Sequence, residues 1–264
     1  MKKIFIYLLA LFSGASLTLA FAPFRIDIIA IISLCIFFAL VDKADNKRKK
    51  ALIGFLFGVG FYTTGLAWVS VSIELFTQSF AVGAALAGVL VVVASLVTTT
   101  AFALITNLLI RNNSTILKIF IFPAVWVLVE IFKANAIFGG FPWVSIGYSQ
   151  TESSLIWYAI LGGVYFVTYI VAFISAIITF AILPNIKDIK KTASFVLVIV
   201  VIYILGFSIS NYNWYKVTSD KQEVVLAQGD FIQGFKWDYN NFKKMKAYYK
   251  NIAEKYHDSM IFYS

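Results

Sequence analysis

Long apolar runs are the feature that most constrains how this chain can fold. Seven of them approach the length that an α-helix needs to cross roughly 30 Å of hydrocarbon. Hydrophobic residues make up 61% of the chain and charged residues only 13%, far from the values of soluble domains. The sequence therefore predicts a polytopic helical membrane protein with about seven spans, at residues 4–22, 26–41, 51–72, 80–110, 116–132, 158–183 and 193–210.

Basic residues gather in alternate connections between these runs. The connections near residues 2, 47, 111 and 190 hold most of the lysines and arginines, whereas the others hold only Arg25 and Lys133. The positive-inside rule then predicts a cytoplasmic N-terminus, and an odd number of spans places residues after 210 on the outer side. The formal net charge of +9 reflects this topology, so we expect no nucleic-acid partner.

The first run and two glycines in the third add local detail. A cleavable signal peptide ending near Ala22 is an alternative for the first run. We favour an uncleaved helix, because the run is long and another apolar run follows at once. Gly54 and Gly58 are four residues apart, which predicts a helix face that another backbone approaches closely.

The connection "EIFKANAIFGGFPWVSIGYSQTESSLIW", residues 130–157, is broken by glycine and proline yet rich in aromatic residues. Trp143, Tyr148 and Trp157 carry amphipathic rings that favour the headgroup layer of a bilayer. We therefore expect this loop to lie in the headgroup interface on the outer side of the membrane that the helices cross. An ordinary aromatic belt remains the alternative to a functional site.

Two ionisable residues stand at the end of the fifth run. Glu130 and Lys133 are i,i+3 neighbours, so they can pair on one helix face. An ionisable residue at such depth is a candidate functional residue. A structural ion pair that anchors the helix end is the equally open alternative.

Residues 211–264 differ from the membrane part. "EVVLAQ" reads as a buried strand, "QGDFIQG" as a turn, residues 239–257 as an amphipathic helix and "MIFY" as a second strand. A parallel strand–helix–strand unit is the default arrangement. Two strands and one helix are too few to bury a core, so we expect an incomplete external α/β domain.

Residues that could act in catalysis or bind a metal are few. Cys35 lies inside an apolar run and is interpreted as a small buried hydrophobe, and His257 as a surface residue on a basic helix. The sequence holds no paired-cysteine or His-rich metal signature and no phosphate-binding glycine loop. These residues alone indicate no cofactor and no catalytic centre.

Four stretches, in order and at similar spacing, resemble the bacterial apolipoprotein N-acyltransferases. They are "LAFAPF", "GFLFGVGFYTTGLAWVSVSI", "EIFKANAIFGGFPWVSIGYSQ" and "VVLAQGDFIQGFKWD". The resemblance implies membrane helices, here residues 1–210, that carry a periplasmic nitrilase-like (carbon-nitrogen hydrolase) domain beginning in residues 211–264. It also implies transfer of an acyl chain from a glycerophospholipid to the N-terminal diacylglyceryl-cysteine of a lipoprotein through a thioester, without metal or cofactor.

The resemblance also suggests which residues shape the substrate entrance or support it. Lys133 stands where the family usually has arginine, and Asp230 where asparagine is more usual. A lysine cannot reproduce the bidentate contact of an arginine, so we expect the partner of this position to be held less rigidly here. The entrance or structural candidates are Glu130, Pro142, Trp143, Tyr148, Gln228, Gln233 and Trp237.

None of the family's catalytic groups can be placed in this sequence. The resemblance puts a glutamate, a lysine and a cysteine beyond Ser264, so we expect a fragment that is inactive alone. A second polypeptide that carries the rest of the domain is one way to complete it. A non-catalytic membrane lipid-binding or assembly module on the same scaffold is the alternative. A transporter is a weaker third reading, since no inverted repeat of broken helices is evident.

Overall fold

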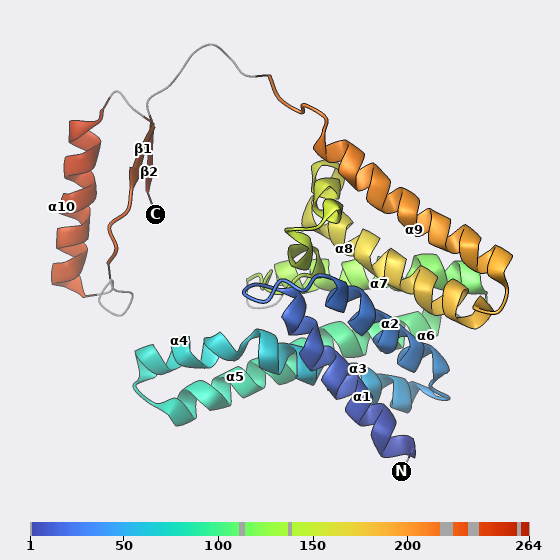
Figure 1. Ribbon diagram of the computed structural model, residues 1–264. Helices are drawn as coiled ribbons and strands as arrows, with labels where there is room; N and C mark the ends of the chain where they lie inside the picture. The colour runs from blue at the N-terminus through green and yellow to red at the C-terminus, as the bar shows by residue number, and fades with distance from the viewer. Residues whose placement is uncertain are drawn as a thin grey trace. The chain divides into compact units, whose positions relative to one another are not determined.

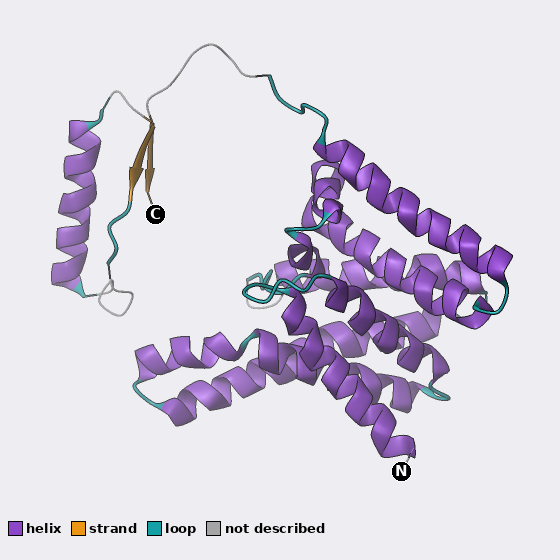
Figure 2. Ribbon diagram, in the orientation of Figure 1, coloured by secondary structure: helices purple, strands orange, loops and turns teal. Residues whose placement is uncertain are grey.

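The computed structural model describes residues 2–110, 114–136, 139–216, 224–231, 238–257 and 260–263. These residues form two compact units, which are described separately below. The first comprises Met1–Glu74 and Ser79–Tyr212, and the second comprises Leu75–Gln78 and Asn213–Ser264. The first unit is helical throughout its regular structure, as Figure 2 shows.

Long helices connected by short turns build the first unit (Figure 1). They are α1 (Lys2–Leu17), α2 (Ile28–Lys43), α3 (Lys47–Gly65), α4 (Ala67–Thr77), α5 (Phe80–Ser95), α6 (Ala101–Leu109), α7 (Thr115–Ala136), α8 (Ala159–Ile177) and α9 (Ile189–Ser210). Shorter 3-10 or π turns are η1 (Thr18–Ala20), η2 (Leu96–Thr100), η3 (Ile146–Gln150), η4 (Ser154–Tyr158), η5 (Ile178–Ile182) and η6 (Leu183–Asn185).

Side-chain caps explain where several helices begin. Asn46 accepts a hydrogen bond from the backbone N–H of Lys49 at the start of α3. Ser79 caps α5 in the same way, and Asp188 caps α9. Each cap satisfies an N–H group that has no partner within its own helix, so the chain enters the helix at a defined residue.

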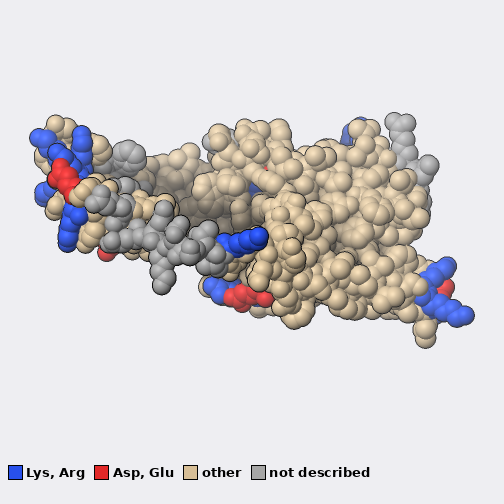
Figure 3. Space-filling view, turned by 90° about the horizontal axis from the view of Figure 1, so that it is seen from above, with Lys and Arg blue, Asp and Glu red and all other residues tan. Residues whose placement is uncertain are grey.

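The predicted apolar runs are all helical, but not all are long enough to cross a bilayer. Among the described residues, four helices are long and apolar enough to cross a membrane: Phe80–Leu109, Thr115–Ala136, Ser154–Asn185 and Ile189–Ser210. The pair α3 and α4, bent by 57°, makes a fifth if it is one span. At 16 residues each, α1 and α2 are about 24 Å long, so the count of seven spans stays a prediction. Figure 3 shows a broad uncharged surface on the first unit.

Aromatic side chains fill the place where α2, α3, α6 and α7 meet. Phe37 stacks on Phe57 with ring centroids 4.1 Å apart, and Phe38 stacks on Phe102 at 5.4 Å. Trp126 meets Phe102 edge-on at 5.3 Å. These five side chains are at most 3% exposed. Because stacked and edge-on ring pairs have preferred geometries, these contacts help to fix the mutual position of the four helices.

The close helix approach predicted at Gly54 and Gly58 is confirmed. A Cβ atom on Gly54 would lie 2.5 Å from the carbonyl oxygen of Thr99, and one on Gly58 would lie 2.3 Å from the Thr99 hydroxyl. The same Cβ on Gly58 would meet Ser95 at 2.7 Å. The two glycines therefore let α3 lie directly against the turn between α5 and α6.

The second unit contains the predicted strand–helix–strand sequence. β1 (Val224–Ala227) pairs in parallel with β2 (Met260–Tyr263), and α10 (Tyr239–Lys255) lies between them in the chain. Asp238 caps α10 by accepting from two backbone N–H groups. Leu226 is 79% exposed and Phe262 54%, so one face of this small sheet is uncovered. Its assignment to a nitrilase-like domain stays a prediction.

We predict that Gly58→Ala destabilises the first unit. Overpacking against Thr99 and Ser95 should lower the free energy of unfolding by about 1–3 kcal/mol, despite the better helix propensity of alanine. Gly88→Ala is the matched control, because nothing lies within 4 Å of a Cβ there. Thermal unfolding in detergent measures both. Equal stability of the two variants would contradict the packing described for α3.

Candidate functional site

The segment of residues 139–153, called here the anchored loop, joins α7 to η4 and contains η3. Gly139 and Gly140 begin it with φ angles of 79° and 119°, a region that favours glycine. A Cβ atom on Gly140 would also lie 2.7 Å from the carbonyl oxygen of Ala134. The N–H of Phe141 then donates to the carbonyl of Lys133 at 3.1 Å. The chain thus turns back sharply over the end of α7.

Glu130 of α7 anchors the middle of this loop. Its carboxylate is buried, with the residue 4% exposed. Oε1 accepts from the indole N–H of Trp126 at 2.9 Å and from the backbone N–H of Ile146 at 3.0 Å. Oε2 accepts from the hydroxyl of Thr168 on α8 at 3.1 Å, and that hydroxyl oxygen accepts from the N–H of Gly147 at 2.9 Å. One carboxylate therefore joins α7, α8 and the anchored loop.

Lys133, one turn further along α7, holds the outer part of the loop. It is 1% exposed, and its Nζ donates to the carbonyl of Trp143 at 2.6 Å. The same Nζ lies 5.8 Å from the ring centroid of Tyr62 on α3, within the range of a cation–π contact. The immediate partners of this ammonium group are the carbonyl of Trp143 and the ring of Tyr62, not a carboxylate.

A direct ion pair between Glu130 and Lys133 was one of two open predictions, and it is wrong. The salt bridges of the described residues, which require N···O distances of at most 4.0 Å, do not include this pair. The i,i+3 spacing does place the two residues on one face of α7. Each charge is nevertheless turned to a partner in the anchored loop, because the loop backbone must also satisfy its polar groups away from water.

The anchored loop is also tied to the turn that precedes α2. Gln150 is 1% exposed, and its side-chain amide donates to the hydroxyl of Ser149 at 2.9 Å and to the carbonyl of Asp27 at 3.4 Å. At the surface, Arg25 forms an ion pair with Glu152. The loop is therefore fixed at its start, its middle and its end.

Aromatic side chains form the exposed rim of the loop. Trp143 is 48% exposed and Tyr148 49%, and Pro142 between the glycines and Trp143 is exposed as well. The Trp143 ring lies 5.0 Å from that of Phe141 and 6.0 Å from that of Trp68 on α4. The loop thus combines a buried polar underside with an apolar, aromatic outer face, as expected of a segment in the membrane interface.

The structure groups some of the predicted site residues and leaves others apart. Glu130, Pro142, Trp143 and Tyr148 belong to the anchored loop or its anchor. Gln228 lies in the second unit after β1, where its carbonyl accepts from the hydroxyl of Tyr248 at 3.2 Å. Gln233 and Trp237 lie outside the described residues.

Sequence reasoning missed two partners of the anchor. Thr168 and Trp126 face the carboxylate of Glu130 from within apolar helices. Thr168 is the only hydrogen-bonding side chain between two tyrosines of α8, a signal that marks a buried polar position but not its partner. The distance of 38 residues to Glu130 could not be bridged from the sequence.

The fold and this site define a class: a helical protein with apolar helices long enough to cross a membrane and an aromatic loop that rests on a buried carboxylate. Residues 13–177 match the family described as "Apolipoprotein N-acyltransferase N-terminal domain". The chain belongs to this family. The matched range includes the anchored loop, its anchor Glu130 and Thr168.

Curated relatives agree with the family. The chain is 34% identical over 259 residues to the apolipoprotein N-acyltransferase of Coxiella burnetii, an alignment of 96% of this chain and 52% of that protein. It is 32% identical over 259 residues to that of Haemophilus influenzae, covering 96% of this chain and 48% of the relative. The Vibrio cholerae protein is 30% identical over 236 residues, covering 87% and 44%. The chain thus spans about half the length of the curated relatives it matches.

We predict that Glu130→Ala destabilises the fold strongly, because the indole of Trp126, the N–H of Ile146 and the hydroxyl of Thr168 would lose their acceptor. The expected loss is about 3–5 kcal/mol of unfolding free energy, measured by thermal unfolding in detergent. Glu130→Gln should lose under about 2 kcal/mol, since the amide oxygen can still accept and the amide nitrogen can donate to Thr168.

The control for this prediction is Glu152→Ala, which removes the exposed ion pair with Arg25. Such pairs contribute less than about 1 kcal/mol. If Glu130→Ala were no more harmful than Glu152→Ala, the anchoring role of Glu130 would be refuted.

Proposed function

We propose that this chain supplies the membrane half of an apolipoprotein N-acyltransferase of the bacterial inner membrane. The observation that carries the proposal is the family match over residues 13–177. The acyl donor is a membrane glycerophospholipid, and the acceptor is the diacylglyceryl-cysteine at the N-terminus of a lipoprotein. The N-terminus is cytoplasmic and the second unit periplasmic, in agreement with the positions of the basic residues.

The anchored loop supports this function because both substrates are lipids that reach the reaction sideways from the bilayer. A surface that receives them has to be apolar outside and rigid inside. Pro142, Trp143 and Tyr148 are exposed on a loop whose backbone is held by Glu130 and Lys133. We assign these exposed residues to the entrance through which acyl chains approach the external domain.

The second unit supplies the first part of that external domain in this proposal. Gln228, Gln233 and Trp237 contribute to its entrance, as the resemblance to the family implies. The exposed side chains of Leu226 and Phe262 would be covered by further strands and helices. A further segment or a second polypeptide would provide them.

The chemistry proceeds in two half-reactions. A cysteine thiolate attacks the ester carbonyl of the phospholipid, and the lysophospholipid leaves as an alcohol after it takes up a proton. The amine of the lipoprotein then attacks the thioester, loses a proton to the general base and releases the thiol. A glutamate acts as the base and a lysine stabilises the oxyanion. The proposal assigns none of these three groups to residues 1–264.

A chimera tests the proposal in cells depleted of their own enzyme. Residues 1–216 of this chain are joined to the remaining half of the Haemophilus influenzae relative, and lipoproteins are analysed by mass spectrometry. We expect triacylated lipoprotein with the chimera and none with residues 1–264 alone, provided that both reach the membrane at equal level. The relative's own complete protein is the positive control.

Each outcome of this experiment has a meaning. Triacylation by residues 1–264 alone would refute the placement of the catalytic groups elsewhere. A chimera that inserts and folds but never acylates would refute the acyltransferase role and favour the alternative, a non-catalytic lipid-binding or assembly module.

Cysteine labelling in intact cells tests the orientation. In a Cys35→Ala background, Asn213→Cys should react with a membrane-impermeant maleimide from outside. Lys47→Cys, equally exposed in the structure, should react only after the membrane is permeabilised. The reverse labelling pattern would overturn the proposed topology.

A further inference from the structure

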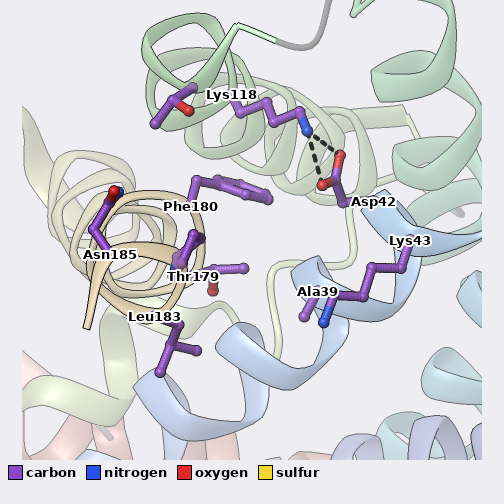
Figure 4. Close-up of a pocket in the computed structure, with 10 residues that line it drawn as sticks. Ala39, Asp42, Lys43, Lys118, Thr179, Phe180, Leu183 and Asn185 are labelled. Carbon is purple, nitrogen blue, oxygen red and sulfur yellow. Dashed lines mark hydrogen bonds and ion pairs between the residues drawn. The ribbon is translucent and has the colours of Figure 1, made fainter. Parts of the chain in front are cut away.

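A second polar site lies at the opposite end of α7 from Glu130. Lys118 is twelve residues before Glu130 in the same helix, which corresponds to about 18 Å along the axis. Here a cavity of about 540 Å³ opens between α2, the start of α7, η5 and η6 (Figure 4). Its volume is within the usual range of small-molecule sites, about 300–1,000 Å³.

Positive charge exceeds negative charge at this cavity. Figure 4 shows Lys118 pointing at Asp42, and its Nζ lies 2.7 Å from Oδ1 and 2.8 Å from Oδ2. Lys43 also lines the cavity. Two ammonium groups against one carboxylate leave a net charge of +1 among the lining residues. Such a cluster attracts an anion.

The ion pair prepares one of these ammonium groups for a ligand. The side chain of Lys118 is only 9% exposed, and that of Asp42 is 26% exposed. The carboxylate therefore holds the Lys118 amine at a fixed position beside the cavity, so little side-chain entropy remains to be lost when an anion binds.

Apolar groups form another part of the cavity wall. The ring of Phe180 lies 5.6 Å from Nζ of Lys118, and Leu183 lines the cavity while 52% exposed. Ile116, close in sequence on α7, is 68% exposed. The cavity thus borders an apolar outer surface. A free inorganic anion gains nothing from such a surface, whereas a phospholipid can lay its acyl chains along it.

We propose that this cavity binds the phosphate headgroup of an anionic phospholipid. Lys43 and Lys118 contact the phosphate, and the acyl chains leave along the surface that includes Leu183. Basic pockets between helices at the cytoplasmic face are a recurrent form of lipid recognition. This site lies at the opposite end of α7 from the anchored loop, so it is separate from the acyl donor of the proposed reaction and does not depend on it.

Native mass spectrometry of the 264-residue chain in detergent tests the proposal. The protein is equilibrated with equal amounts of phosphatidylglycerol and phosphatidylcholine, and the lipids that remain bound are counted. We expect at least about fivefold more phosphatidylglycerol, in line with two lysine contacts to one phosphate. Asp42→Asn/Lys43→Gln/Lys118→Met should abolish this preference.

Two further variants make the result specific. Lys190→Gln changes the net charge by the same −1 as the combined variant, but Lys190 is exposed and lines no part of the cavity; it should keep the preference. Lys43→Gln leaves the buried pair of Asp42 and Lys118 intact and should weaken the preference at least twofold. It serves as the decisive variant if circular dichroism shows that the combined variant loses helix.

Three results would overturn the proposal. The first is an unchanged preference in Lys43→Gln together with a folded combined variant that also keeps it. The second is phosphatidylethanolamine, added in place of phosphatidylcholine, retained as strongly as phosphatidylglycerol, which would mean that net charge does not select the ligand. The third is displacement of the lipid by millimolar inorganic phosphate, which would identify a free-anion site.

Discussion

The buried carboxylate of Glu130 is the interaction on which the site depends. An ionised group inside an apolar helix bundle is costly unless hydrogen-bond donors surround it. Here the donors come from Trp126 on the same helix, from Ile146 in the anchored loop and from Thr168 on α8. The need to satisfy one charge therefore fixes the loop against two helices, and the loop needs no large apolar core of its own.

The polar groups of α7 are placed at its two ends. Glu130 and Lys133 hold the anchored loop at the carboxyl end, while Lys118 pairs with Asp42 near the amino end. The aromatic cluster around Trp126, Phe37 and Phe102 separates them. This division is the one that a bilayer imposes, since charges are tolerated where they meet the interface or the protein interior. It also separates the proposed substrate entrance from the proposed headgroup site.

Much of the fold could be predicted from the sequence, because apolar runs and caps act over short distances. The helices, the close approach at Gly54 and Gly58 and the parallel pairing of β1 with β2 all follow from local patterns. The span count stays a prediction, and hydropathy did not show that the run 51–72 bends by 57° between α3 and α4. The hydrogen-bond partners of Glu130 were also missed. The i,i+3 spacing on a helix predicts only the local neighbour Lys133, whereas Ile146 and Thr168 come from distant segments. The predictions for Gln233 and Trp237 remain untested, because these residues lie outside the described ranges.

The role of Glu130 in positioning the anchored loop for the proposed acyl transfer is tested most directly by the ratio of triacylated to diacylated lipoprotein in cells that depend on the chimera described above. At matched amounts of folded chimera in the membrane, Glu130→Gln should keep most of the ratio, and Glu130→Ala should reduce it at least tenfold, since about 1.4 kcal/mol of lost positioning corresponds to a factor of ten. A ratio unchanged by Glu130→Ala would contradict the account.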